Sequence, residues 1–107
     1  MSLLSAHVLD AAVGAPAAGV RVDLALASGE VLASATTGAD GRVGDLGPDR
    51  LDPGDYLITF GSGAYFAARG TVCFYPTVTV TFTVTDQSHY HVPLLLSPYS
   101  YTTYRGS

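Results

Sequence analysis

The sequence has one cysteine, no lysine and no long apolar run, and each shortage excludes a class of protein. Cys73 has no partner for an internal disulfide and cannot build a cysteine-rich zinc site, so we expect a small buried thiol. Five scattered arginines and a net charge of −4 leave no basic patch that could follow a phosphate backbone. We therefore expect no nucleic acid partner.

No apolar stretch approaches the roughly 18 residues that a membrane span needs, and the N-terminus lacks the basic start of a signal peptide. We expect a soluble, cytoplasmic protein without a membrane partner. The length of 107 residues indicates one domain covering 1–107. Hydrophobic residues make up 48% of the chain and charged residues only 13%, a balance that favours self-association.

Short alternating segments separated by glycine- and proline-containing turns predict an all-β protein. In residues 20–27, aliphatic side chains alternate with polar and small ones, as in a half-buried strand. Residues 62–70 have the only helical signature, with a serine N-cap and a glycine stop. We expect strands at 4–9, 20–27, 31–37, 43–46, 56–60, 77–84, 89–96 and 100–105. About eight strands with one short helix indicate a two-sheet β-sandwich.

The three histidines lie on strands whose opposite face is apolar. His7 alternates with Leu4, Ala6 and Val8, and His89 and His91 alternate with the aliphatic residues of the last long strand. The two-residue spacing of His89 and His91 points both rings to the same side. An ordinary surface or hydrogen-bonded histidine is the simplest interpretation of each, but the pairing favours a general acid/base site.

A hydrolytic zinc site is the alternative for these histidines. Zinc needs three protein ligands, which His7, His89 and His91 would supply. Zinc-bound water usually has a carboxylate beside it, and the acidic residue nearest the pair in sequence is Asp86. We therefore expect no metal and no cofactor, with the zinc hydrolase kept as an alternative that chelation would test.

Arg42 and Arg105 are candidate donors to a carbonyl or an oxyanion. Arg42 follows a glycine turn, and Arg105 lies near the C-terminus between the hydroxyls of Tyr104 and Ser107. Solvated arginines and a frayed terminus are the ordinary alternatives. No GxSxG, P-loop or GxGxxG motif is present, which leaves attack by water with imidazoles moving protons and guanidinium groups stabilising charge.

Several motifs along the whole chain resemble those of the 5-hydroxyisourate hydrolases, a family also called transthyretin-like proteins. The matching segments are HVLD at 7–10, DGR at 40–42, SGAYF at 62–66, FYP at 74–76 and HYHVPLLLSPYSYTTYRGS at 89–107. The ending YRGS is the most specific of these marks. Transthyretin itself, a carrier with the same fold, lacks that ending and has other residues at positions 7, 42 and 91.

The resemblance implies a transthyretin-like sandwich, a homotetramer arranged as a dimer of dimers, and an active site at each end of its central channel. The implied reaction is hydrolysis of 5-hydroxyisourate to 2-oxo-4-hydroxy-4-carboxy-5-ureidoimidazoline during urate degradation, a branch of purine metabolism. The implied catalytic residues are His7, Arg42 and His91, with Tyr104, Arg105 and Ser107 completing the substrate pocket and His89 supporting it. A small-ligand carrier without catalysis is the second interpretation.

Overall fold

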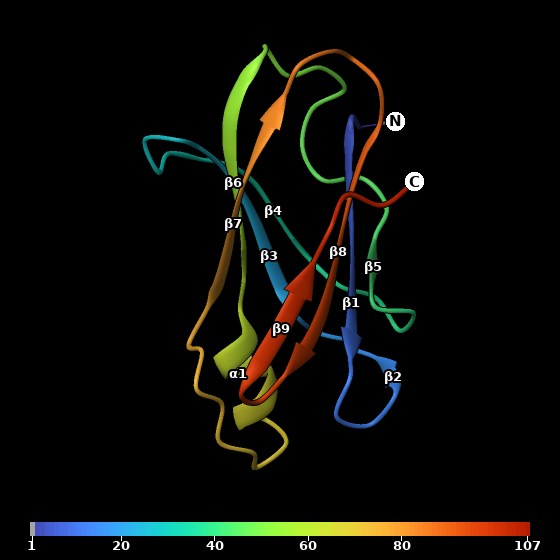
Figure 1. Cartoon of the computed structure of the whole chain (residues 1–107), viewed down its shortest axis with the longest axis vertical. Helices are drawn as coiled ribbons and strands as arrows, with labels where there is room; N and C mark the ends of the chain where they lie inside the picture. The colour runs from blue at the N-terminus through green and yellow to red at the C-terminus, as the bar shows by residue number, and fades with distance from the viewer. Residues whose placement is uncertain (1) are drawn as a thin grey trace.

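The computed structural model describes residues 2–107, which form two β-sheets packed face to face with one short helix at one end (Figure 1). The first sheet has the order β2-β1-β8-β9, with β5 also paired to β1, and the second has the order β4-β3-β6-β7. The first sheet contains β1 (Leu4–Asp10), β2 (Ala15–Pro16), β5 (Arg42–Val43), β8 (Tyr90–Ser97) and β9 (Ser100–Thr103); the second contains β3 (Arg21–Leu26), β4 (Val31–Thr36), β6 (Gly54–Phe60) and β7 (Val78–Val84). The predicted sandwich is confirmed.

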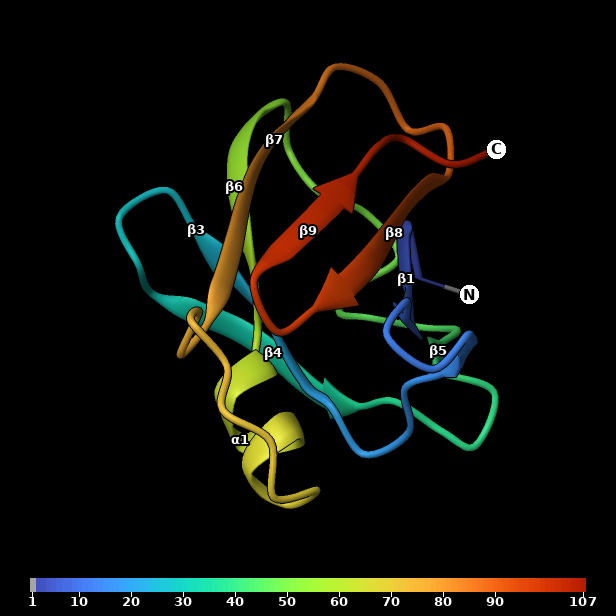
Figure 2. The ribbon, with the colours of Figure 1, turned by 60° about the horizontal axis from the view of Figure 1, so that its bottom comes forward.

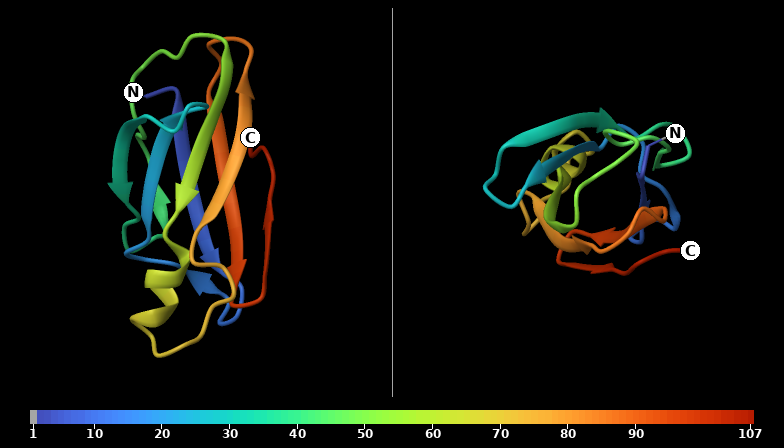
Figure 3. Two further views of the ribbon diagram at one scale, coloured as in Figure 1. Left: turned by 90° about the vertical axis from the view of Figure 1, so that its left-hand side faces the viewer. Right: turned by 90° about the horizontal axis from the view of Figure 1, so that it is seen from above.

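The core lies between the two sheets, where the alternating apolar residues meet. Leu4 and Leu94 from the first sheet and Leu24, Ile58 and Phe60 from the second are fully buried. The view from above in Figure 3 shows the two layers enclosing this space. Successive side chains of a strand point to opposite faces of the sheet. His7 in β1 and His91 in β8 alternate with the buried residues of their strands, so both lie on the outer face of the first sheet.

Two boundaries differ from the sequence prediction because of pairing between distant segments. Residues 15–16, read as the end of the first strand, form β2 by pairing back onto β1, so residues 2–107 contain nine strands. The segment predicted at 43–46 pairs only at Arg42–Val43, which places Arg42 inside a strand. Gly41 precedes it with φ +76°, and a Cβ there would lie 2.4 Å from the Val8 carbonyl oxygen. Only glycine fits this approach.

The helix α1 (Ser62–Ala67) is shorter than the predicted segment 62–70, with no basic residue in its last turn, and it also begins differently. Gly61 precedes the first turn without a side-chain cap, and the Ser62 hydroxyl instead donates to the Tyr75 carbonyl, 2.8 Å away. The predicted serine N-cap is therefore wrong, because this hydroxyl is used to hold the following loop. The chain leaves the helix through Gly70 at φ +66°, as the glycine stop predicted.

Two smaller expectations also change. Cys73 is half-buried, because it lies in the loop after the helix, where its thiol donates to the Tyr75 carbonyl at 3.2 Å. The last strand ends at Thr103, where antiparallel pairing with β8 stops, and an isolated bridge between His91 and Gly106 follows.

Within residues 2–107, no helix is long and apolar enough to cross a membrane.

A buried hydrogen bond joins the end of β1 to the helix. The Tyr65 hydroxyl donates to a carboxyl oxygen of Asp10 at 2.8 Å. Both residues are buried, since Tyr65 is 4% exposed and Asp10 is 2% exposed. The other oxygen of Asp10 accepts from the Ala12 amide at 3.0 Å. This contact fixes the end of the strand that carries His7.

We expect Tyr65→Phe to lower the free energy of unfolding by about 1–3 kcal/mol, because it leaves a buried acceptor without its donor. Urea unfolding at one fixed protein concentration measures the change. Tyr75→Phe is the matched control, since its hydroxyl bonds an exposed carbonyl, and we expect a loss below about 0.5 kcal/mol. Equal losses in the two variants would contradict the structural role given to Asp10.

Candidate active site

Three of the predicted site residues meet on the outer face of the first sheet. His7 lies opposite Arg42 in the antiparallel β1–β5 pair, and the β1–β8 pair is parallel. The rings of His7 and His91 have centroids 6.5 Å apart and planes tilted by 36°. The geometry brings His7, Arg42 and His91 into one cluster, although they are far apart in the chain.

The His7 ring is oriented by the turn that precedes β5. Its Nε2 lies 3.0 Å from the Asp40 carbonyl oxygen. A carbonyl only accepts, so Nε2 carries a proton, and in the neutral ring Nδ1 holds the lone pair. The Asp40 side chain also accepts from the Arg42 amide at 3.0 Å, so one turn orients the imidazole and starts the strand that carries the guanidinium.

Ser5 also lies in the candidate site, although the sequence pattern did not predict it. Its hydroxyl oxygen lies 2.7 Å from His91 Nδ1 and 2.8 Å from His89 Nε2. Ser5 pairs with His91 in the parallel register, so the side chains of both residues project from the same face. The sequence does place Ser5 two residues before His7, on the polar face of the first strand. Its contact with His91 could not be predicted, because it depends on which strand pairs with the first one.

Burial is the main reason that the pKa of His91 is lowered from its ordinary value of 6.5. The positive charges of Arg42, His7 and His89 lower this pKa further, in that order. A lowered pKa keeps the ring neutral at pH 7. A neutral imidazole beside a guanidinium group is suited to accept a proton from water.

The C-terminal segment is fixed to β8 rather than frayed. The Gly106 amide donates to the His91 carbonyl at 2.8 Å, and a Cβ on Gly106 would lie 2.5 Å from His91 Cδ2. Figure 2 shows this segment returning beside β8 after β9. Tyr104 and Ser107 are exposed on either side of the bridge.

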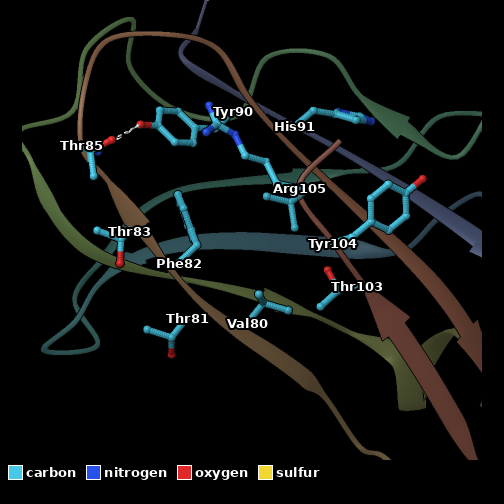
Figure 4. Close-up of a pocket in the computed structure, with 11 residues that line it drawn as sticks. Val80, Thr81, Phe82, Thr83, Thr85, Tyr90, His91, Thr103, Tyr104 and Arg105 are labelled. Carbon is cyan, nitrogen blue, oxygen red and sulfur yellow. Dashed lines mark hydrogen bonds between the residues drawn. The ribbon is translucent and has the colours of Figure 1, made fainter. Parts of the chain in front are cut away.

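Arg105 points away from the imidazoles. Its guanidinium group lies 4.2 Å from the Tyr90 ring centroid and donates to the Ser88 hydroxyl and the His89 carbonyl at 3.2 and 3.4 Å. In Figure 4, Arg105 extends toward Tyr90, whereas His91 extends in another direction. The structure thus brings His7, Arg42 and His91 together, and places Arg105 on the other side of the C-terminal segment.

A pocket of about 390 Å³ lies on that other side, between β7 and the C-terminal segment (Figure 4). Its lining is mainly aliphatic, aromatic and threonine side chains, and it includes His91, Tyr104 and Arg105 at one wall. The volume suits a small molecule. The pocket does not contain His7 or Arg42, so the titratable groups converge on the outer face of the sheet and not in this cavity.

No group of three or more His, Cys, Asp or Glu residues within 2–107 has a geometry that could hold a metal ion. The cluster offers the Nδ1 lone pair of His7, a neutral ring on His91 and the guanidinium group of Arg42. This combination can activate water and stabilise a developing oxyanion.

The fold and this cluster together define a transthyretin-like sandwich with a titratable site on the outer face of one sheet. The sequence profile of the HIUase/Transthyretin family matches residues 4–106, and the chain belongs to that family.

Known proteins similar to the chain include hydrolases and a transthyretin. The 5-hydroxyisourate hydrolase of Mus musculus is 45% identical over 113 residues, covering 99% of this chain and 96% of that protein. The solved Klebsiella pneumoniae 5-hydroxyisourate hydrolase has a TM-score of 0.91 and 39% identity, covering 97% and 98% of the two chains. Sea bream transthyretin, solved with thyroxine, has a TM-score of 0.89 and 32% identity, covering 96% and 93%.

We expect Gly106→Ala to displace the His91 ring or release the C-terminal segment, because the added methyl group has no space beside Cδ2. The His91 ring resonances in a two-dimensional NMR spectrum report the displacement. Gly44→Ala is the control, since a Cβ at Gly44 meets nothing within 4 Å. Unchanged His91 resonances in Gly106→Ala would contradict the close contact.

We expect Arg42→Gln to raise the pKa of His91 toward 6.5 without reaching it, because the larger cause of the lowered pKa is burial. An NMR titration of the His91 ring measures this directly and needs no substrate. Arg21→Gln, on the second sheet and paired with Asp23, should leave the titration unchanged. A lower pKa in Arg42→Gln would contradict the electrostatic account.

Proposed function

We propose that the chain is an enzyme that hydrolyses 5-hydroxyisourate to 2-oxo-4-hydroxy-4-carboxy-5-ureidoimidazoline in urate degradation. The observation that carries this proposal is the convergence of two imidazoles, 6.5 Å apart, with a guanidinium group on the neighbouring strand. The names of the mouse and Klebsiella relatives support the same reaction.

In this mechanism, water attacks a ring carbonyl of the substrate. A neutral imidazole of the His7–His91 pair takes the proton from the attacking water as the new C–O bond forms. Arg42 donates to the oxyanion that develops on the carbonyl oxygen. The ring C–N bond then breaks, and the departing nitrogen receives a proton from an imidazolium group, so no cofactor takes part.

The C-terminal residues have separate roles in the proposal. Tyr104 and Ser107 are exposed beside His91 and are proposed to contact the substrate. Arg105 holds the segment in place through Ser88 and the His89 carbonyl, and its contact with the substrate stays a prediction. His89 supports the site through its hydrogen bond to Ser5.

We also propose that the protein acts as a cytoplasmic homotetramer, a dimer of dimers, formed by single domains of residues 1–107. The edge strands β7 and β9 have no further strand beyond them in the chain that the structure describes. Exposed apolar side chains support self-association, notably Val72, Phe74 and Tyr99. In this assembly, the outer faces of the first sheets would enclose the clusters in a channel.

A small-ligand carrier is the second candidate, favoured by the apolar pocket beside β7 and by the similarity to transthyretin. A carrier binds without turnover, and its site needs no convergent titratable groups. The hydrolytic site requires them.

We expect His7→Ala, Arg42→Ala and His91→Ala each to remain folded and to lose at least about 100-fold in kcat/KM, the usual contribution of one acid/base or oxyanion group. An absorbance assay coupled to urate oxidase measures the decay of freshly made 5-hydroxyisourate. The control is Arg21→Ala, which removes an arginine from the second sheet and should keep wild-type activity.

Wild-type rates in all three variants would reject the assignment of these residues. Retained activity after chelation fits the metal-free mechanism, whereas loss that zinc restores would favour the zinc hydrolase. Because the pKa of His91 is lowered, the fall in kcat/KM on acidification should have its midpoint below pH 6.5.

A further inference from the structure

The Ser5 hydroxyl connects two histidines, and the mechanism above does not use it. Ser5 is only 8% exposed, in the middle of β1, with His91 Nδ1 at 2.7 Å and His89 Nε2 at 2.8 Å. His91 is half-buried and His89 is exposed. The three groups therefore form a continuous hydrogen-bonded chain from the cluster to the solvent.

The hydrogen-bonding capacity of a hydroxyl restricts the protons in this chain. Ser5 has one proton, and where it donates this proton to one of the two rings, the other ring must carry an N–H that donates to the oxygen. In one arrangement, His91 Nδ1–H donates to Ser5 and Ser5 donates to His89 Nε2. In the other arrangement, both bonds reverse, and His91 carries its proton on Nε2.

The charges around His91 distinguish these two arrangements. The Nδ1 atom faces Ser5, which leaves Nε2 as the ring nitrogen available to the cluster. The guanidinium group of Arg42 on β5 carries a positive charge that acts on His91, and a nitrogen lone pair is more favourable near such a charge than an N–H. The first arrangement presents this lone pair.

We propose that Ser5 is a positioning residue that, together with His89, holds His91 in the tautomer protonated at Nδ1 and open at Nε2. This inference rests on the proposed function where it concerns catalysis, because the open Nε2 is the atom that would accept the proton of water. The hydrogen-bond assignment itself rests only on the geometry of the three side chains.

The same chain stabilises the cation that forms during the reaction. When Nε2 accepts a proton, the Nδ1–H bond to Ser5 becomes charge-assisted, and Ser5 in turn donates more strongly to His89. Transfer of the Nδ1 proton to Ser5 and of the Ser5 proton to His89 would move the charge to the exposed ring. No proton is gained or lost within the chain, and the positive charge moves from a half-buried site to the solvent.

The first test is the ¹⁵N spectrum of the His91 ring in the wild-type protein, recorded at a pH where the ring is neutral. Ring nitrogen shifts distinguish a protonated nitrogen from one with a lone pair. We expect a protonated Nδ1 and an unprotonated Nε2. A protonated Nε2 would overturn the assignment, whatever the activity of the protein.

The second test compares Ser5→Ala with Ser5→Thr. Ser5→Ala should shift the His91 ring toward the Nε2–H tautomer and lower kcat by about 10- to 100-fold, the usual cost of losing a partner that orients a functional group, with little change in KM. Ser5→Thr keeps a hydroxyl on the strand and should restore both the tautomer and kcat. Ser62→Ala removes a buried hydroxyl bonded to a carbonyl in the loop after the helix and is the control.

Wild-type kcat and an unchanged tautomer in Ser5→Ala would overturn the proposal. If Ser5→Ala does not fold, the wild-type spectrum and the Ser5→Thr variant still decide it. A wild-type protein that has the Nδ1–H tautomer but does not accelerate 5-hydroxyisourate decay would reject the proposed function and leave the hydrogen-bond assignment intact.

Discussion

The parallel pairing of β1 with β8 is the constraint on which the candidate site depends. This register places Ser5 beside His91 and His7 beside Pro93, while β5 adds Arg42 on the other side of His7. A shift of the register by one residue would turn every side chain of one strand to the opposite face. The buried Leu4, Ala6 and Val8 on the core side prevent such a shift, so packing of the core also fixes the chemistry of the outer face.

The groups around His91 disfavour its protonated form. Arg42, His7 and His89 all lower the pKa of His91, and burial lowers it more. Such an arrangement costs stability whenever His91 is protonated, and it keeps the ring neutral at physiological pH. The pocket between β7 and the C-terminal segment lacks this convergence, since neither His7 nor Arg42 lines it.

The sequence predicted the fold because the alternation of apolar residues is a local signal. It also predicted the outward direction of His7 and His91, since direction follows from parity along a strand. It did not predict Ser5, β2 or the orientation of Arg105, because each depends on which distant segment lies alongside. The role of Ser5 follows only from the parallel register, and Arg105 turns toward Tyr90 because an aromatic face and two acceptors lie there. The glycine requirement at Gly106 likewise arises from the His91 ring, 15 positions earlier in the sequence.

We propose that the chemistry takes place on the outer face of the β5-β1-β8 strands. A crystal structure of the assembled protein with a non-hydrolysable cyclic ureide, shaped like 5-hydroxyisourate, tests it most directly. We expect the analogue to lie between the His7 and His91 rings, with a carbonyl oxygen within hydrogen-bonding distance of Arg42. An analogue bound instead in the pocket beside β7, away from His7 and Arg42, would contradict it.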